Sequence, residues 1–546
     1  MSRDLVEIIR RHHEHGVPAA LDALRLAVEH HGEITDDDRR LAAERSGLPQ
    51  AAVDGVSSDL LQPRGARHIR VCTGTACFAT TVGAHVDALR RAFGCELGGL
   101  ARDGSVSLAE TACLGLCHSS PAIRDGDVVD AGAGAVERVI ADGARSAREP
   151  PPRCALDEPV LLASGHGWAA LSRAVATLTP EQLLEEVELA HVRGRSGAGS
   201  AIAARWELAR RAEGERTFIV ANADGGDPGS YVDKLLVEQH PELLLEGMAL
   251  AGYAVGADHG FVLTRAEYPH SKPALEWAAV VARRAGLLGP SVLGSDFAFD
   301  VTILEGGGSY VLGEETAALA CRHVLCETGR PPSAARPGLY GMPAVVDDVE
   351  TLCNIPVIVL RGAERYAQVS PGASSGSKLV CFNERFARPG VYEVPFGVTL
   401  RELCEELAGG LRDGHEIKAL QIGGPRGAIL PASRLDTRLD FDELAAVGCT
   451  LGHGAIVAFD ETTDMRALAR HLLRSGAGAN RGTCVACRIG LRRAHELLCD
   501  EAPVDRDALE ALLDGLELGS PCAHGAAMPA PIRSLLAYFP DELGLA

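Results

Sequence analysis

Two groups of cysteines constrain the fold of this chain more than any other feature of its sequence. The first group holds Cys72, Cys77, Cys113 and Cys117, and the second holds Cys484, Cys487 and Cys522. In a reducing compartment, clustered thiols are more often metal ligands than disulfides. We therefore expect each group to be brought together around an inorganic centre.

The first group has the spacings C-x4-C and C-x3-C, and each pair follows a β-type run, HIRVCTG or VSLAETACLG. Each iron of a two-iron two-sulfur cluster takes two cysteines, so two pairs from neighbouring loops can enclose one cluster. A structural zinc site, or thiols that pack as small hydrophobes, would use similar spacings. Spacing alone leaves these alternatives open.

The second group lacks one ligand. In the segment NRGTCVACRIG, Arg481 stands where a third thiolate would complete a C-x-x-C-x-x-C run. Arginine stays protonated and cannot replace a thiolate. Three thiolates can hold a three-iron cluster, or a four-iron cluster whose fourth ligand is another group such as His524 or Cys499. The alternative is a vestigial site whose thiols pack inside a helical bundle.

Length and periodicity divide the chain into domains. A chain of 546 residues exceeds the size of one hydrophobic core. Strand-helix alternation and helix-period apolar positions predict an α/β multidomain protein. The expected parts are an N-terminal helical bundle (1–65), a compact α/β module (66–148), a Pro-rich linker (149–160), a large α/β domain (161–370), a small β unit (371–460) and a C-terminal helical bundle (461–546).

Charge and hydropathy restrict the partners. The formal net charge of -21 argues against nucleic acid or an anionic membrane as the main partner. The N-terminal residues have no apolar h-region of a signal peptide, and no apolar stretch reaches the ~18 residues of a spanning helix. We expect a cytoplasmic protein with no direct membrane insertion.

A Gly-rich segment, HVRGRSGAGSAIAARW, lies at a predicted loop-to-helix junction. Its glycines let the backbone approach a phosphate or a flavin edge, and the helix N-terminus offers free N–H groups to an anion. Such a loop is often only a tight turn. Three further segments follow it in order: ANADGGDPGSYVDK, GGGSYVLGEETAAL and PGLYGMPAVVDDVETLCNIP.

Together these segments resemble the NADH-binding flavoprotein (diaphorase) subunits of respiratory complex I, NAD-linked formate dehydrogenases and bidirectional hydrogenases. VCTGTACF and ETACLGLCHSSPAI resemble the thioredoxin-like ferredoxin module of the same complexes. The resemblance covers nearly the whole chain. It implies a thioredoxin-like 2Fe-2S domain, a Rossmann-like FMN domain, a β-grasp-like domain and a C-terminal iron-sulfur bundle.

The resemblance also implies site residues. Carried over by position, the flavin contacts are Gly194, Arg195, Gly197, Arg205, Asn222, Asp224, Tyr310, Gly313, Glu314, Glu315 and Thr351. The seven cysteines would hold a 2Fe-2S cluster and a 4Fe-4S or 3Fe-4S cluster. NAD(H) would exchange electrons with FMN, and the clusters would relay them to or from a catalytic subunit with iron-sulfur and molybdenum-type centres.

Several positions depart from the family pattern. Arg205 stands where the family has a lysine, and Gly225 stands where it has a carboxylate. Asp347 and Asp348 replace the two asparagines that usually precede the VET sequence. Two carboxylates beside a phosphate are unfavourable unless neighbours compensate them. The positions where aromatic rings hold the adenine read Ser200, Leu208 and Ser333. Two hypotheses follow: a diaphorase-type subunit that uses NAD(H) and FMN, or a degenerate, nucleotide-free iron-sulfur relay or assembly subunit.

Overall fold

The computed structural model describes residues 19–20, 23–24, 27, 34–50, 53, 65–163, 167–197, 199–224, 227–306, 339, 342–370, 373–479, 484–500, 503–520 and 523–545. Several predicted site residues lie outside these ranges: Gly225, Tyr310, Gly313, Glu314, Glu315, Ser333, Arg481 and Cys522. Most of the expected N-terminal bundle lies outside them too. Its described part includes α3 (Asp36–Ser46), which begins with a capping box between Thr35 and Asp38.

The first α/β module folds around a five-stranded sheet in the order β2-β3-β1-β4-β5. The strands are β1 (Arg67–Cys72), β2 (Gly99–Leu100), β3 (Val106–Thr111), β4 (Ala122–Asp125) and β5 (Val128–Ala131), and the helices are α5 (Thr75–Thr81), α6 (Ala84–Phe93) and α7 (Ala135–Ala141). β1 and β3 are parallel, with Cys72 opposite Thr111. The loops after both strands therefore emerge at the same edge of the sheet, which is where the two cysteine pairs lie.

The large α/β domain contains a four-stranded parallel sheet in the order β10-β7-β8-β9. Its strands are β7 (Phe218–Ala223), β8 (His259–Thr264), β9 (Asp300–Glu305) and β10 (Ala344–Asp348). β7 and β8 are buried along their whole length, as expected for parallel strands covered by helices. The helices are α8 (Ala169–Thr177), α9 (Pro180–Leu189), α10 (Ile202–Arg211), α11 (Val232–Gln239), α12 (Pro241–Val255), α13 (Ser271–Arg284), α15 (Val349–Arg361) and α16 (Ala363–Ala367).

A mixed six-stranded sheet follows, in the order β14-β13-β15-β11-β12-β6. It comprises β11 (Ser377–Phe382), β12 (Gly390–Pro395), β13 (Ile417–Ile422), β14 (Ile429–Pro431) and β15 (Ala455–Asp460), with helix α17 (Phe441–Ala446), and it encloses a core of its own. The edge strand β6 (Arg153–Cys154) comes from the segment predicted as a linker. The carboxylate of Glu393 on β12 accepts the Val160 N–H at 3.2 Å, which holds that segment to the sheet.

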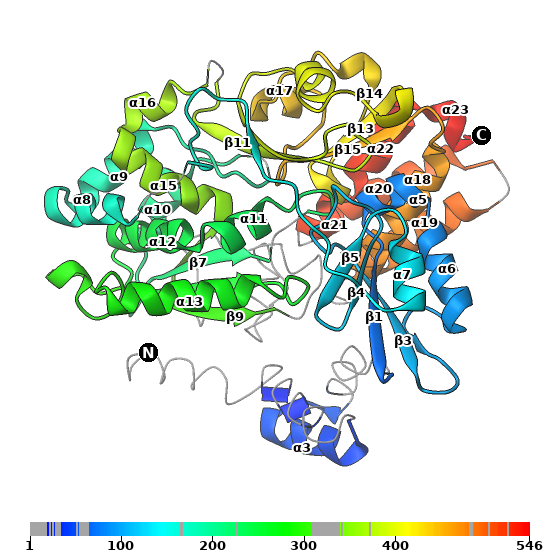
Figure 1. The fold of residues 1–546 in the computed structure, drawn as a ribbon, viewed down its shortest axis with the longest axis horizontal. Coiled ribbons are helices and arrows are strands. Elements are labelled where there is room, and N and C mark those ends of the chain that lie inside the picture. The colour runs from blue at the N-terminus through cyan, green and yellow to red at the C-terminus, as the bar shows by residue number, and fades with distance from the viewer. Residues whose placement is uncertain are drawn as a thin grey trace.

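The C-terminal region is helical, as predicted: α18 (Met465–Gly478), α19 (Val485–Cys499), α20 (Arg506–Gly519), α21 (Ala523–Ala527), α22 (Pro529–Tyr538) and α23 (Pro540–Leu543). Leu491, Ala494 and Leu498 share the buried face of α19. In Figure 1 the bundle lies beside α5 and α6 of the first module, and α18 contacts α5. Among the described helices, none is both long and apolar enough to cross a membrane.

Candidate redox sites

The first cysteine group comes together at the edge of its sheet. Cys72 ends β1 and Cys77 lies on α5, and the loop after β3 supplies Cys113 and Cys117, all four buried. The Cys113 and Cys117 sulfurs lie 3.5 Å apart, and the Cys72 thiol contacts those of Cys77 and Cys113. The thiols thus form a row of neighbours, and among the described residues no group of three or more ligands could hold a single metal ion. A row of paired thiols suits a centre with two irons, each bound by two cysteines.

The surroundings favour the thiolate of Cys113. Hydrogen bonds from Cys117 and Cys72, the charge of Arg265 and the Gly115 N–H bring its pKa well below the ordinary value. The Gly115 N–H donates to the Cys113 sulfur at 3.3 Å. Thiolate is the form that binds metal, and N–H donors to sulfur are a feature of iron-sulfur sites. These residues therefore fit a 2Fe-2S cluster.

The Gly-rich loop joins α9 to α10 and packs on the start of α15. The Arg195 N–H donates to the Thr351 hydroxyl at 2.7 Å, and the Ser196 N–H donates to Asp348 at 3.2 Å. Gly197 has a φ of 66°, which a side chain would strain. The Arg195 side chain is fully buried and donates to the Tyr366 hydroxyl at 2.7 Å. We assign that side chain to holding the loop in place.

The polar residues of this domain gather where ligands bind in parallel α/β sheets. Asn222 and Asp224 lie at the carboxyl end of β7, and Asp347 and Asp348 end β10. Strands β8 and β9 lie on one side of β7, and β10 lies on its other side, so the strand order reverses between β7 and β10. Crevices at such switch points are the usual binding sites of this architecture. The Gly-rich loop is hydrogen-bonded to the β10 side of this crevice.

Asp347, the first of the two unexpected carboxylates, is compensated by residues of α10. It forms an ion pair with Arg205 and accepts the Trp206 indole N–H at 2.8 Å. Burial raises the pKa of Asp347, and Arg205 opposes this rise. The Arg205 guanidinium also lies near Gly194, since a Cβ built on that glycine would be 3.8 Å from it. The cation that replaces the usual lysine therefore serves both the loop and Asp347.

Asp348 is compensated by hydrogen bonds and by a histidine. Its carboxylate caps α15 by accepting the Thr351 N–H at 2.8 Å and the Thr351 hydroxyl at 2.6 Å. Burial alone would raise the pKa of Asp348, but the charge of His453 and the Thr351 hydrogen bonds lower it below the ordinary value. The two carboxylates are therefore stabilised by the protein itself. Arg205, Asn222 and the loop backbone carry the kinds of polar group that fit an FMN phosphate and ribityl chain.

Two residues of this region were not identified from the sequence. Arg265 follows β8 directly, is fully buried, and places its Nε 3.6 Å from the Asp224 carboxylate. Its charge also lowers the pKa of Cys113, so it connects the crevice with the first cysteine group. His453 lies 3.4 Å from Asp233 on α11. The sequence signal that could have identified Arg265 is its place directly after the β-branched run HGFVLT, since ligands of α/β sheets bind at strand carboxyl ends. No comparable signal marks His453.

The second cysteine group is described in part. Cys484 is the N-cap of α19, and its sulfur accepts the N–H of buried Cys487 at 3.4 Å. Helix α21 packs against this site, because a Cβ built on Gly525 would be 3.2 Å from that of Cys487. His524 lies on α21, and burial lowers its pKa to about 4, which keeps the imidazole neutral. Cys499 lies 12 residues beyond Cys487 on the same helix, roughly 18 Å away, and is excluded as a fourth ligand.

Two of the positions expected to hold an adenine are described. The Ser200 carbonyl accepts the Gly194 N–H at 2.8 Å and so closes the Gly-rich loop. Leu208 lies on α10 with 48% of its surface exposed. An exposed aliphatic side chain supplies apolar contact but no aromatic face for stacking.

Comparison with known proteins agrees with this arrangement. Residues 187–357 match the family profile of the Nuo51 FMN-binding domain. Residues 5–140 match the thioredoxin-like 2Fe-2S ferredoxin, and residues 467–545 match the NADH-ubiquinone oxidoreductase-F iron-sulfur binding region. The F 2 subunit of the NADH-quinone oxidoreductase of Rhizobium meliloti (strain 1021) is 36% identical over 69% of this chain and 92% of its own length. The chain belongs to the family of NADH-quinone oxidoreductase F subunits.

Other relatives are subunits of multi-subunit redox complexes. The NADH-quinone oxidoreductase F subunit of Escherichia coli (strain K12) is 36% identical over 69% of this chain and 87% of its own length. The NADP-reducing hydrogenase subunit HndC of Solidesulfovibrio fructosivorans is also 36% identical, over 69% of this chain and 78% of its length. A chain of the NAD+-reducing NiFe-hydrogenase in the H2-reduced state superimposes with a TM-score of 0.84 and 27% identity, over 97% of this chain and 93% of that one. These relationships confirm the predicted family and fold class, and they support the flavin-linked hypothesis over the nucleotide-free relay.

Proposed function

We propose that this chain is the diaphorase-type subunit of a multi-subunit oxidoreductase, exchanging electrons between NAD(H), FMN and iron-sulfur clusters. FMN, when bound, links two-electron exchange with NAD(H) to one-electron exchange with clusters. The observation that carries the proposal is the position of Arg265 between the switch-point crevice and the first cysteine group. Asp224 ends β7 in that crevice, Arg265 reaches Asp224, and the charge of Arg265 acts on the Cys113 thiol.

Each residue of the crevice has a role suited to its chemistry. We assign the loop backbone at Gly197, with Arg205, to the flavin phosphate, because N–H groups and a guanidinium are preferred phosphate donors. Gly194 closes the loop through its N–H to the Ser200 carbonyl, and we assign it to the shape of the flavin loop. Thr351 holds the loop to α15 through the Arg195 N–H. Asn222 and Asp224 supply amide and carboxylate groups for the ring and the ribityl hydroxyls. Tyr310, Gly313, Glu314 and Glu315 complete the predicted contacts.

The cysteines supply the relay. We assign Cys72, Cys77, Cys113 and Cys117 to a 2Fe-2S cluster, and Cys484, Cys487 and Cys522 to a 4Fe-4S or 3Fe-4S cluster. Two relatives support a partner that holds the catalytic metal, since HndC and the NAD+-reducing chain are named as parts of hydrogenases. We propose a cytoplasmic complex in which that partner is a hydrogenase or a molybdenum-type formate dehydrogenase subunit.

The test uses the full chain purified anaerobically, with flavin released and quantified and the visible spectrum followed on adding NADH. We expect stoichiometric FMN and rapid bleaching by NADH. Arg205→Gln should reduce bound FMN, because it removes the phosphate cation, and Arg205→Lys should restore much of it. Arg211→Gln is the matched control, since Arg211 lies on the same helix with its side chain 75% exposed. A flavin-free protein with loaded clusters that does not bleach with NADH would refute the proposal.

A further inference from the structure

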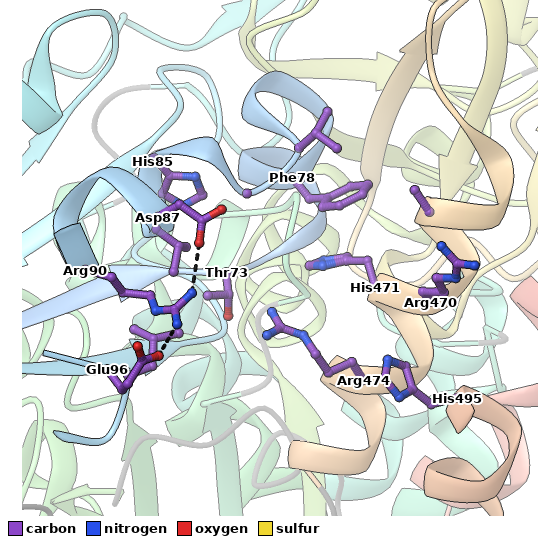
Figure 2. Close-up of a pocket in the computed structure, with 15 residues that line it drawn as sticks. Thr73, Phe78, His85, Asp87, Arg90, Glu96, Arg470, His471, Arg474 and His495 are labelled. Atoms are coloured by element: carbon purple, nitrogen blue, oxygen red, sulfur yellow. Dashed lines mark hydrogen bonds and ion pairs between the residues drawn. The ribbon is translucent and has the colours of Figure 1, made fainter. Parts of the chain in front are cut away.

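A cavity of about 480 Å³ lies between the first module and the C-terminal bundle (Figure 2). One wall is built by the end of α5 and by α6, and the other by α18 and α19. The described cysteines of both groups are absent from its lining. Its volume falls within the roughly 300–1,000 Å³ typical of small-molecule sites. This space is separate from the residues assigned to flavin and to either cluster.

The cavity carries an excess of positive charge. On the module wall, Arg90 is balanced by Asp87 at 2.9 Å and by Glu96. On the bundle wall, Arg470 and Arg474 lie one turn apart on α18, and the Arg470 Nε donates to the Leu498 carbonyl at 2.6 Å. Figure 2 shows Arg474 and His471 pointing from the bundle toward the module. Within the described part of the chain, neither Arg470 nor Arg474 forms an ion pair with a carboxylate.

His471 adds a buried polar atom that lacks a partner among the described residues. Its ring stacks on Phe78 with 4.1 Å between centroids and an interplanar angle of 15°, and only 7% of the residue is exposed. The atom without a hydrogen bond to any described residue is Nε2. Nearly all buried polar atoms in proteins are hydrogen-bonded, so an orphaned one indicates a missing group. Burial, with the charge of Arg474, lowers the pKa of His471 to about 3, which keeps the ring neutral.

The rest of the cavity lining is largely apolar. Phe78, Val82, Val86, Leu97 and Ala467 offer surface to an uncharged body, while the cations stand on one side. A guanidinium presents a planar fork of donors that matches phosphate oxygens in pairs. A ligand with a phosphate at one end and an organic body at the other would satisfy both parts of the cavity.

We propose that this cavity binds a phosphate-bearing small molecule, whose phosphate is held by Arg470 and Arg474 and whose body lies against Phe78 and His471. Because the two walls belong to different domains, the ligand bridges the first module and the C-terminal bundle. The site is additional to the flavin phosphate site and does not depend on it.

The experiment uses the holoprotein with FMN and clusters loaded, so that the flavin phosphate site is filled. Isothermal titration calorimetry with inorganic pyrophosphate and with AMP should show saturable binding of at least one of them. Arg470→Gln and Arg474→Gln should each weaken binding about tenfold or more, the usual loss for a hydrogen bond to a charged group. Arg474→Lys keeps the positive charge but lacks the planar guanidinium, so its affinity for the probe should lie between those of the wild type and Arg474→Gln.

Arg492→Gln is the matched control, because Arg492 lies on α19 outside the cavity lining with its side chain 81% exposed. It should bind each probe with the same affinity as the wild type. The proposal is overturned if the wild-type holoprotein binds neither probe, or if the Arg470 and Arg474 variants bind as tightly as Arg492→Gln. Binding of pyrophosphate alone would contradict the proposed place of an organic body against Phe78 and His471, and tighter binding of AMP than of pyrophosphate would support it.

Discussion

His453 gives the interface between the flavin domain and the mixed sheet a pH dependence that can be measured. Its imidazole lies 3.4 Å from the Asp233 carboxylate, and its backbone N–H donates to Asp227 at 3.1 Å. The neighbouring Gly452 N–H donates to the Gly197 carbonyl of the Gly-rich loop at 3.2 Å. The loop that carries His453 is therefore bonded directly to the predicted flavin site.

The magnitude follows from the pKa of His453. Burial alone would lower this pKa, but Asp233, Asp227 and Asp348 outweigh burial and raise it to about 9. The unfolded value is about 6.5, and each tenfold change in proton affinity corresponds to about 1.4 kcal/mol. The linked stabilisation is on the order of 3 kcal/mol. Because the folded pKa is raised, this stabilisation is fully present below pH ~6.5 and is lost as the pH rises through ~9.

The assay compares wild type with His453→Gln by urea unfolding at several pH values between about 6 and 10. The gap in unfolding free energy should be largest at pH ~6 and should shrink by about 3 kcal/mol at pH ~10. FMN should dissociate faster from wild type above pH ~9, since the loop contact weakens. His415→Gln, which removes a half-exposed histidine paired with Glu461, should show no comparable gap. A gap that stays constant with pH, or an imidazole that titrates near pH ~6.5 by NMR, would refute the reasoning.

Four further predictions concern the cysteines, a buried ion pair and the Gly-rich loop. Cys113→Ser should abolish or distort the paramagnetic signal of the reduced N-terminal cluster, whereas Cys95→Ser should leave it unchanged; stoichiometric zinc without iron would contradict the assignment. Arg481→Cys should raise the iron content by about one atom if it completes a three-iron cluster, while a loss of iron in His524→Ala alone would identify His524 as the ligand. Lys378→Met should cost about 3–5 kcal/mol in urea unfolding, because it leaves the buried Glu350 carboxylate without its cation; full stability would show that the pair is not formed. Gly199→Ala should lower FMN retention, because the new Cβ would lie 2.5 Å from the Phe441 ring and the residue has a φ of 68°. Gly256→Ala is the control, because it has similar backbone strain but no atom within 4 Å of its Cβ, and it should retain FMN. Equal FMN retention in the two variants would exclude the contact with Phe441 as a cause of FMN loss.

The sequence by itself determined the features that depend on local patterns. The sequence patterns predicted the strands β1 and β3, the α/β character of the large domain and the C-terminal helices, because strand and helix formation follow from side-chain spacing. The two pairs in the first cysteine group predicted a metal or cluster site, since each pair follows a predicted strand, and the resemblance of their segments to the ferredoxin module favoured two irons over zinc. The order of the glycine-rich and acidic segments indicated the family.

Only the tertiary structure decided which distant residues meet. Asp347 and Asp348 looked unfavourable beside a phosphate, yet Arg205, Trp206 and His453 compensate them from elements far apart in the chain. The sequence allowed Cys499 as a fourth cluster ligand. The structure excludes it, because the continuous helix α19 places Cys499 far from Cys487. The arginine-lined cavity between α6 and α18 has no signal in either segment alone. Charge compensation and cavities depend on distances between elements, and a linear pattern carries no information about those distances until the domains pack.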